Sequence, residues 1–244
     1  ICARGRGARC SEPTGRRCRS SMRSSLCRRF PDVEVRNLNI AQGERPLWQG
    51  LSLTVKAGER LGISAPSGHG KTTLGRVLAG WQPIGAGGQI LLDGQPVPER
   101  VKGYNPIQLV PQHPELTFNP YRTTGQALWD VWRPDEAMLA RFMVKPAWLG
   151  RKPGQLSGGE LARIALLRAL DPRTRLLIAD EVTAQLDPQI QRQLWRELMM
   201  ECEQRGLGML VFSHQQALLR QICHRVLRFG EMQPESGELT ESAA

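Results

Sequence analysis

Short apolar runs, separated by polar segments rich in Gly and Pro, recur from Val33 to Arg228. Runs that alternate in polarity, or that are continuously rich in Val, Ile and Leu, predict strands. These runs are VEVRNLNI (33–40), LSLTV (51–55), RLGIS (60–64), QILLDG (89–94), IQLVPQ (107–112), RLLIAD (175–180), GMLVFS (208–213) and RVLRF (225–229). Helical spacing predicts helices over KTTLGRVLAG (71–80), LSGGELARIALLRAL (156–170), residues 188–204 and one further segment before Arg225.

The order of these elements predicts an α/β fold. The early strands, with AQGERPLWQG (41–50) interpreted as the break between the first two, favour an antiparallel region. After residue 155, helices and strands alternate, and RLLIAD is apolar enough to be buried on both faces of a parallel sheet. In residues 123–150, apolar side chains from Leu128 to Met143 recur at helical intervals, interrupted by Pro134 and Pro146, which predicts a small helical subdomain.

Composition narrows the possible classes of protein. The 244 residues are 40% hydrophobic, which is enough for a substantial core, and no apolar stretch approaches the roughly 18 residues of a membrane-spanning helix. The net charge is +10, but residues 1–30 hold nine of the 33 basic residues and one of the 23 acidic ones, so residues 31–244 carry only +2. This distribution argues against a nucleic-acid-binding body. The six cysteines follow no C-x-x-C pattern and are expected to be reduced, as in the cytosol.

Three segments are expected along the chain. Residues 1–30 have the composition of a disordered basic extension or of a misassigned start, with Met22 as a candidate first residue. Residues 31–235 form the predicted domain, with the helical subdomain at about 115–165. Residues 236–244 are expected to be a frayed tail.

The stretch SAPSGHGKTT, from Ser64 to Thr73, joins a predicted strand to a predicted helix. It is either an ordinary turn or a phosphate-binding loop. The phosphate loop is favoured because Gly68 and Gly70 leave backbone N–H groups open to phosphate oxygens and Lys71 adds a positive charge at the helix N-terminus. The string matches G-x-x-x-x-G-K-[ST] except at Ala65, and the hydroxyl of Thr72 can ligate magnesium.

Two further strings carry candidate chemistry. RLLIADE places Asp180 and Glu181 at the carboxyl end of a buried strand, where ligands gather in open α/β sheets. QLSGGE forms a second helix start, in which Ser157 and Glu160 fit a capping box. The cap does not account for the two bare glycines, Gly158 and Gly159, which expose backbone N–H groups above the helix.

Taken in order, the motifs resemble those of the ATP-binding cassettes of ABC transporters over residues 33 to about 230. APSGHGKTT is similar to Walker A, Gln112 to the Q-loop, LSGGE to the signature motif, LLIADE to Walker B, AQLD to the D-loop and His214 to the switch histidine. The resemblance implies a P-loop domain with a RecA-like, mainly parallel core, an antiparallel β subdomain and a shortened helical subdomain.

The resemblance also implies ATP and Mg²⁺ as ligands and a head-to-tail dimer, in which each nucleotide lies between the Walker motifs of one cassette and the signature motif of another. It assigns nucleotide contacts to Ser67, Gly68, His69, Gly70, Lys71, Thr72, Thr73 and Asp187, and to Ser157, Gly158 and Gly159 of the neighbour; magnesium to Thr72, Gln112 and Asp180; and catalysis to Glu181, His214 and Gln112. The implied partners are a second cassette, with a heterodimer favoured over a homodimer, membrane permease subunits and an extracytoplasmic solute-binding protein. The implied location is the cytoplasmic face of the membrane.

Several positions depart from the family pattern. Gln42 stands where an aromatic residue usually stacks on adenine, and Trp48 is either its substitute or a core residue. Ala65 replaces a glycine and would be strained at positive φ. Val182 and Glu160 replace the usual proline and glutamine. These departures lead to the hypothesis that two unlike cassettes pair and that their composite sites are unequal.

TFNPYRTTGQAL, after Gln112, and the context of the signature motif resemble the nickel and di/oligopeptide importer branch, although only 45 positions separate Gln112 from Ser157. Two alternatives remain open. One is a soluble cassette ATPase that acts on nucleic acid or the ribosome, and the other is a degenerate cassette with a regulatory role.

Overall fold

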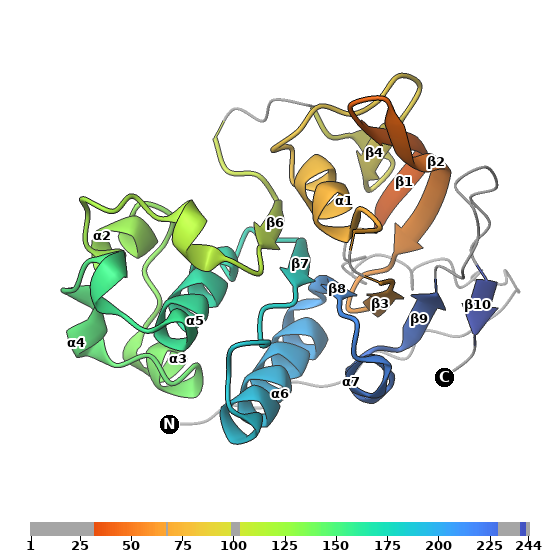
Figure 1. Ribbon diagram of the computed structural model, residues 1–244. Helices are drawn as coiled ribbons and strands as arrows, with labels where there is room; N and C mark the ends of the chain where they lie inside the picture. The colour runs from red at the N-terminus through yellow and green to blue at the C-terminus, as the bar shows by residue number, and fades with distance from the viewer. Residues whose placement is uncertain (1–31, 67, 99–102, 229–239, 243–244) are drawn as a thin grey trace, which may run out of the picture.

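The structure is a computed structural model that describes residues 32–66, 68–98 and 103–228, together with the backbone of 240–242. It has two lobes (Figure 1). The larger lobe contains two sheets with helices on their faces, and the smaller lobe is helical and lies beside the end of the larger sheet. The predicted basic head, residues 1–30, and Ser67 lie outside the described residues.

The smaller sheet is antiparallel and has the strand order β2-β1-β4-β5. Its strands are β1 (Val33–Gln42), β2 (Arg45–Val55), β4 (Gln89–Leu92) and β5 (Gln95–Pro96). The interpretation of residues 41–50 as a break between strands is wrong for most of that segment. β1 continues to Gln42 and pairs with β2 from Arg45, because three register shifts in the pair absorb the irregular spacing of the side chains.

The larger sheet has the order β10-β9-β3-β8-β7-β6, and all of its neighbouring strands are parallel except β10 and β9. Its strands are β3 (Arg60–Ser64), β6 (Ile107–Val110), β7 (Leu176–Asp180), β8 (Gly208–Phe212), β9 (Arg225–Arg228) and β10 (Thr240–Ser242). Within the expected frayed tail, residues 240–242 pair with the edge strand β9, which offers them unpaired backbone groups; the other residues of that tail lie outside the described part of the chain.

Helices cover both faces of the larger sheet (Figure 1). They are α1 (Lys71–Leu78), α5 (Gly158–Ala169), α6 (Pro188–Arg205) and α7 (Gln216–Ile222). Strand β7 is apolar on both of its faces because each face lies in a core. Leu176 and Ile178 enter the core shared with α1 and the small sheet. Leu177 and Ala179 enter the core shared with α5 and α6. The predicted burial on both faces is confirmed.

The helical lobe consists of α5 and several short elements. These elements are the 3-10 turns η1 (Pro114–Thr117) and η2 (Pro153–Gln155) and the helices α2 (Thr124–Trp129), α3 (Glu136–Arg141) and α4 (Pro146–Leu149). An ion-pair network ties α3 to α6: Arg141 contacts Glu197 at 2.7 Å and Glu201 at 2.8 Å, and Glu201 also contacts Arg205 at 3.1 Å. The buried Glu201 therefore links the helical lobe to α6, which covers one face of the larger sheet.

Two cysteines lie in the described part of the chain, Cys202 in α6 and Cys223 after α7. Both are free and buried, and burial raises the pKa of each thiol to about 12. They are inert core residues, because the thiolate is the reactive form of cysteine.

The predicted α/β fold, with a mainly parallel core, an antiparallel subdomain and a helical lobe, is confirmed. Among the residues that the structure describes, no helix combines the length and the apolar character needed to cross a membrane.

Candidate nucleotide-binding site

Four parallel strands end at one edge of the larger sheet, and each is followed by a predicted site residue. Strand β3 leads into the glycine loop (65–70), β6 into Gln112, β7 into Glu181 and β8 into His214. Pairing brings the strand ends level, because Phe212 on β8 stands opposite both Ile63 on β3 and Asp180 on β7. Such an edge is the usual ligand site of an open α/β sheet.

Lys71 lies inside the curve of the glycine loop. Its ammonium group donates to the carbonyl oxygens of Ala65 at 2.6 Å and Pro66 at 3.0 Å, and the residue is 7% exposed. An ammonium group carries three N–H donors, so one remains after these two bonds. The loop and Lys71 thus form a unit that presents positive charge beside the start of α1.

The start of α1 is open to an anion. Gly70 has the left-handed φ of 79° and caps the helix without a side-chain hydrogen bond. Among the described residues, no acceptor is found for the backbone N–H groups of Lys71, Thr72 and Thr73. The exposed Gly68, at φ 82°, has no atom near the position of a Cβ. Free N–H groups, the helix dipole and Lys71 together make a site that suits a phosphate group.

Ala65 is not strained. The described non-glycine residues at positive φ are Asn37, Asp93, Met143 and Glu181, and Ala65 is absent from this set. The expected penalty for replacing a glycine at this position therefore does not arise. Its carbonyl instead serves as an acceptor for Lys71.

Thr72 and Asp180 form a pair of oxygen ligands. The Thr72 hydroxyl donates to Oδ2 of Asp180 at 2.7 Å, and Asp180 is 1% exposed. Burial, reinforced by the neighbouring Glu181, raises the pKa of the Asp180 carboxyl, and the Thr72 hydrogen bond and Lys71 oppose this effect. A cation placed beside the pair would stabilise the charged carboxylate.

This set of oxygen atoms fits magnesium only with help from a ligand. Among the described residues, no group of three or more His, Cys, Asp or Glu side chains could hold a metal ion. Mg²⁺ in nucleotide sites typically takes one or two protein oxygens and completes its shell with phosphates and water. Thr72 and Asp180, with Gln112 exposed beyond the adjacent strand end, match that pattern.

Glu181 and His214 approach each other beside Asp180. Nδ1 of His214 lies 3.0 Å from Oε1 of Glu181, and the glutamate side chain is 12% exposed whereas the imidazole is 54% exposed. Glu181 has a φ of 49°, and its N–H donates to the carbonyl of Phe212 at 3.1 Å. This positive φ is strain stored at a predicted site residue.

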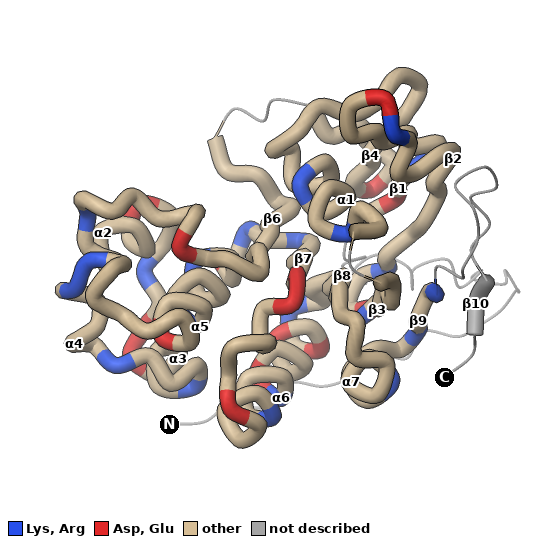
Figure 2. Tube along the Cα trace, in the orientation of Figure 1, with Lys and Arg blue, Asp and Glu red and all other residues tan. Residues whose placement is uncertain are grey.

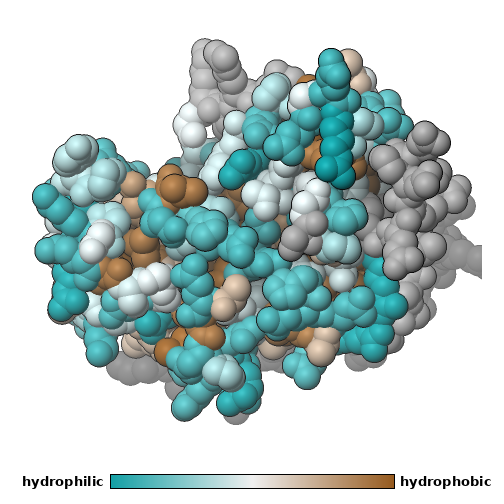
Figure 3. Space-filling view, viewed as in Figure 1, coloured by the Kyte–Doolittle hydropathy of each residue, from teal (hydrophilic) through white to brown (hydrophobic). Residues whose placement is uncertain are grey.

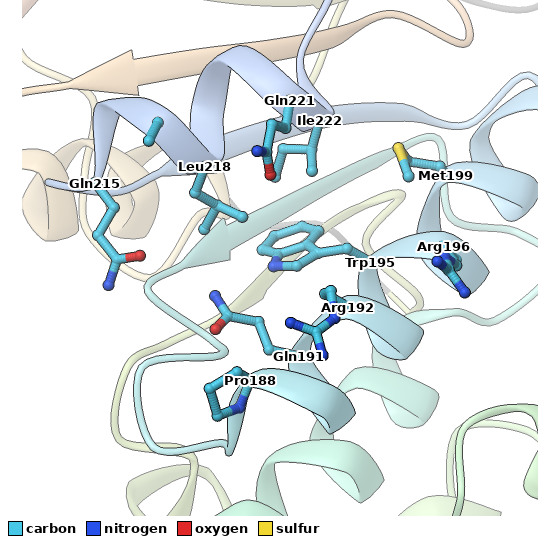
Figure 4. A pocket seen from close by; sticks show the side chains of 11 residues that line it. Pro188, Gln191, Arg192, Trp195, Arg196, Met199, Gln215, Leu218, Gln221 and Ile222 are labelled. Atoms are coloured by element: carbon cyan, nitrogen blue, oxygen red, sulfur yellow. The ribbon is translucent and has the colours of Figure 1, made fainter.

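The segment after Glu181 is anchored on α6. Oγ1 of the buried Thr183 accepts hydrogen bonds from Gln191 Nε2 at 3.1 Å and from Trp195 Nε1 at 3.3 Å. Trp195 also forms the floor of a groove of about 510 Å³ between α6 and α7, with Leu218 opposite (Figure 4). Sequence patterns did not predict this anchor, because its partners are brought together only by the packing of α6.

Ser157 forms the predicted capping box. Its hydroxyl accepts from the N–H of Glu160 at 3.3 Å, and its own N–H donates to the Glu160 carboxylate at 2.9 Å. The hydrogen bond from the Ser157 N–H lowers the pKa of Glu160. Glu160, which departs from the family pattern, is therefore used in the cap.

The two glycines after Ser157 also have a packing role within the chain. A Cβ on Gly158 would stand 2.2 Å from Oε1 of Gln185, and a Cβ on Gly159 would stand 2.7 Å from Cδ2 of Leu186. The segment that follows Glu181 thus packs against the start of α5. Ser157 and Gly158 remain exposed, and Gly159 is partly exposed.

The remaining predicted residues differ in exposure and in hydrogen bonding. Asp187 is the N-cap of α6, since its Oδ1 accepts from the N–H groups of Gln189 and Ile190 at 3.0 Å each. His69 is exposed in the glycine loop, and Val182 is buried in the core. Gln42 is exposed at the end of β1.

Not all of the predicted site residues come together. The start of α5 belongs to the helical lobe, and the start of α1 lies in the other lobe, above the sheet (Figure 1). One chain thus carries two separate helix starts with exposed backbone, at Gly70 and at Ser157.

Comparisons with known proteins agree with this arrangement. The family model described as ABC transporter matches residues 48–184, which is more than half of the chain. The chain is 32% identical over 211 residues to the methionine import ATP-binding protein MetN of Caulobacter vibrioides, covering 81% of this chain and 62% of that protein. It is 34% identical over 196 residues to a putative peptide import ATP-binding protein of Brucella abortus, covering 72% of this chain and 58% of that protein.

Other matches point the same way. The nickel import ATP-binding protein NikE of Pseudomonas putida is 33% identical over 199 residues, covering 73% of this chain and 71% of that protein. A dimeric structure of the ATP-binding cassette MJ0796 bound to ADP and Pi superposes with a TM-score of 0.70 at 22% identity, covering 86% of this chain and 98% of the other. The chain spans about three fifths of the length of several import proteins that it matches. The span matched by the family model contains the glycine loop, the start of α5 and the end of β7. Because this match covers more than half of the chain, the chain belongs to the ABC transporter family.

Proposed function

We propose that this chain binds and hydrolyses ATP as the cassette subunit of an ABC importer. The observation that carries the proposal is the convergence of Lys71, the Thr72–Asp180 pair and the Glu181–His214 pair on one edge of the parallel sheet. In this arrangement the N–H groups at the start of α1 and Lys71 hold the β and γ phosphates. Bound Mg²⁺ would neutralise charge on the phosphate oxygens, and Thr72, Asp180 and Gln112 are the residues that would hold it.

Glu181 is the proposed general base. It accepts a proton from the water whose oxygen attacks the γ-phosphorus, the bond to the ADP oxygen breaks, and inorganic phosphate leaves. His214, in contact with Glu181, orients that carboxylate. Positioning and electrostatics carry most of the catalysis in such reactions.

The neighbouring half of each ATP site comes from a second cassette. The start of α5 exposes backbone at Ser157 and Gly158 but lies in the lobe opposite α1, which favours the head-to-tail pairing in which it faces the nucleotide of a partner. The degenerate cassette depends on two departures, Gln42 and Ala65; Ala65 is unstrained and no longer supports it, whereas Gln42 still does. A pairing of unlike cassettes stays our proposal.

The proposed membrane partner is a permease that docks on the helical lobe, which would hold the chain on the cytoplasmic face of the membrane. Leu116 is 76% exposed, Tyr121 85% and Trp129 47%, and all three lie in or between η1 and α2. Figure 3 shows hydrophobic surface on this lobe among hydrophilic residues. Exposed apolar side chains gathered in one region are typical of an interaction surface.

The proposed cargo is a nickel complex or a di- or oligopeptide, delivered by a solute-binding protein. The sequence TFNPYRTTGQAL and the matches to nickel and peptide import proteins support this class, although other matches are named for methionine and polyamines. The rival function on nucleic acid has less support, because acidic and basic residues are interspersed over both lobes in the described part of the chain (Figure 2).

The test is ATP hydrolysis by a complex of this chain with a candidate permease and solute-binding protein taken from the neighbouring genes, reconstituted in liposomes. We expect hydrolysis to require Lys71 and Glu181 and to be stimulated by the loaded binding protein. Stimulation by RNA or DNA, without any response to the permease, would favour the rival. An unchanged rate in Glu181→Gln would favour the regulatory cassette.

A further inference from the structure

Trp48 touches the glycine loop from the back. Trp48 lies on β2 of the antiparallel sheet. Its indole Nε1–H donates to the carbonyl oxygen of Gly70 at 3.2 Å. Trp48 is only 6% exposed and belongs to the core shared by the two sheets. An indole nitrogen that is buried this deeply normally finds a hydrogen-bond acceptor, and here the acceptor belongs to the residue that precedes Lys71.

The Gly70 carbonyl is held from two sides. It accepts the first helical bond of α1, from the N–H of Leu74 at 2.8 Å, as well as the bond from Trp48. A carbonyl oxygen has two lone pairs, so these two donors saturate it. The orientation of the peptide plane between Gly70 and Lys71 is thereby fixed.

That peptide plane also carries the N–H of Lys71. In a trans peptide the C=O and the N–H point in opposite directions, and all peptide bonds described here are trans. Directing the Gly70 oxygen toward Trp48 therefore directs the Lys71 N–H away from it, to the open side of the loop. Lys71 is also one of the three residues at the start of α1 whose N–H groups have no acceptor among the described residues.

The fit between loop and indole is tight. A Cβ on Gly70 would stand 2.9 Å from Nε1 of Trp48 and 3.1 Å from side-chain atoms of Leu47. The glycine is thus required here both by its φ of 79° and by the wall that Leu47 and Trp48 form behind it. A smaller residue at position 48 would remove part of this wall.

We propose that Trp48 is a positioning residue for phosphate binding, which acts through Gly70 and does not stack on adenine. The proposal rests on the proposed function. Stacking on a base requires an exposed ring face, and the 6% exposure of Trp48 leaves none. The alternative raised by the sequence, that Trp48 substitutes for the missing aromatic residue at Gln42, is thus replaced by a contact with the phosphate loop.

The test compares two ligands, ATP and inorganic tripolyphosphate, by titration calorimetry with Mg²⁺ on the full chain. Trp48→Phe keeps the aromatic packing but removes the N–H. We expect the dissociation constants of both ligands to rise by the same factor, about 3- to 10-fold, which is the range of one net hydrogen bond. If Trp48 stacked on adenine, its replacement would raise the dissociation constant of ATP but not that of tripolyphosphate. That result would overturn the proposal.

Trp132→Phe is the matched control. The Trp132 indole also donates to a backbone carbonyl, that of Leu167 at 2.8 Å, but it lies in the helical lobe. We expect this variant to lower the melting temperature without changing either dissociation constant. Equal affinities in Trp48→Phe and wild type, with both proteins folded, would reduce Trp48 to a core residue.

A second variant separates the loss of the N–H donor from the loss of the ring. In Trp48→His, Nε2 occupies the ring position of the indole nitrogen, so the donor returns while much of the apolar ring is lost. Affinity for tripolyphosphate closer to wild type than in Trp48→Phe, despite lower stability, is the expected rescue. Failure of the wild-type chain to bind either ligand would overturn the proposed function itself, whereas wild-type binding without a Trp48 effect overturns only this inference.

Discussion

Glu181 and His214 lie side by side at the ends of neighbouring strands, with 3.0 Å between Oε1 of the carboxylate and Nδ1 of the imidazole. Their strands, β7 and β8, are paired in register up to Asp180 and Phe212, so the main chain sets the spacing of the two side chains. The carboxylate is enclosed and the imidazole is open. This difference places the proposed proton acceptor inside the site and its proposed orienting partner at the rim.

Replacing Glu181 by Gln keeps the size of the side chain and a hydrogen-bond acceptor but removes the base. We expect the ATPase rate of the assembled complex to fall by about 10²- to 10⁴-fold, because general base catalysis contributes that range. ATP binding by the same variant should be retained, since the proposed phosphate contacts come from the glycine loop. Steady-state hydrolysis and titration calorimetry measure the two quantities.

A second His–Glu contact in the chain supplies the control. His113 and Glu115 are 3.1 Å apart, but both are exposed and lie at the start of the helical lobe. Glu115→Gln should leave the hydrolysis rate of the complex within a factor of about two, because an exposed pair contributes little. Equal losses in the two variants would contradict a special role for Glu181.

Ser157→Ala should have two effects of different origin. The loss of an N-cap hydroxyl is expected to lower the free energy of unfolding by about 1 kcal/mol. Thr123→Ala is the matched comparison, because Thr123 forms a capping box with Gln126 on α2. Urea unfolding should give similar losses for both variants, but only Ser157→Ala should also lower the ATPase rate of the dimer. Parallel effects on hydrolysis would mean that Ser157 is a cap and nothing more.

Glu201→Gln should destabilise the chain more than Glu197→Gln. Glu201 is 5% exposed at its side chain and contacts both Arg141 and Arg205, whereas Glu197 is 15% exposed and contacts only Arg141 among these residues. Gln at position 201 takes the negative charge away from two arginines. Both arginines are partly exposed and Arg141 keeps Glu197, so the expected loss at Glu201 is roughly 1 to 2 kcal/mol. Urea unfolding of the two variants measures the difference; a larger loss at Glu197 would contradict the assignment of Glu201 as the link between the lobes.

His224 should make stability depend on pH. Burial and the charge of Arg60 lower the pKa of the imidazole, whose Nδ1 accepts a hydrogen bond from the Arg60 N–H at 3.0 Å, and the carboxylates of Glu59 and Glu203 oppose this shift. Since the folded-state pKa lies below the unfolded value of about 6.5, the contribution is full above that pH and is lost as the pH falls through the folded-state pKa.

Urea midpoints measured from pH 7.5 to 5.5 test this sign. The wild-type midpoint should fall with pH more than that of His224→Gln, whose side chain does not titrate. A steeper fall in His224→Gln would show that the sign is wrong.

The sequence could predict those features of the fold and the site that depend on neighbours along the chain. Helical periodicity placed α1, α5 and α6 within a few residues, and the apolar runs placed β3, β7 and β8. The capping box of Ser157 and Glu160 is local by nature and is present. The hairpin between β1 and β2 was misjudged, because its bulges disguise the alternation on which strand prediction depends.

Other parts of the site depend on contacts between distant segments. Nothing near position 48 indicates that its indole meets Gly70, and nothing near Thr183 indicates that Gln191 and Trp195 hold its hydroxyl. Likewise, a motif cannot show that Ala65 avoids positive φ, because the path of the loop is set by its contacts with Lys71.

The sequence alone fixes which chemical groups this protein has available. It sets the residues that follow each strand, the glycines that leave backbone N–H groups accessible, and the lysine, hydroxyl and carboxylate side chains. Which of them meet depends on how the chain packs. The strand order β3-β8-β7-β6 places Lys71, His214, Glu181 and Gln112 along one edge and leaves Ser157 in the other lobe. The physical reason is that sheet order is fixed by hydrogen bonds and burial between segments distant in the chain, which no local pattern records.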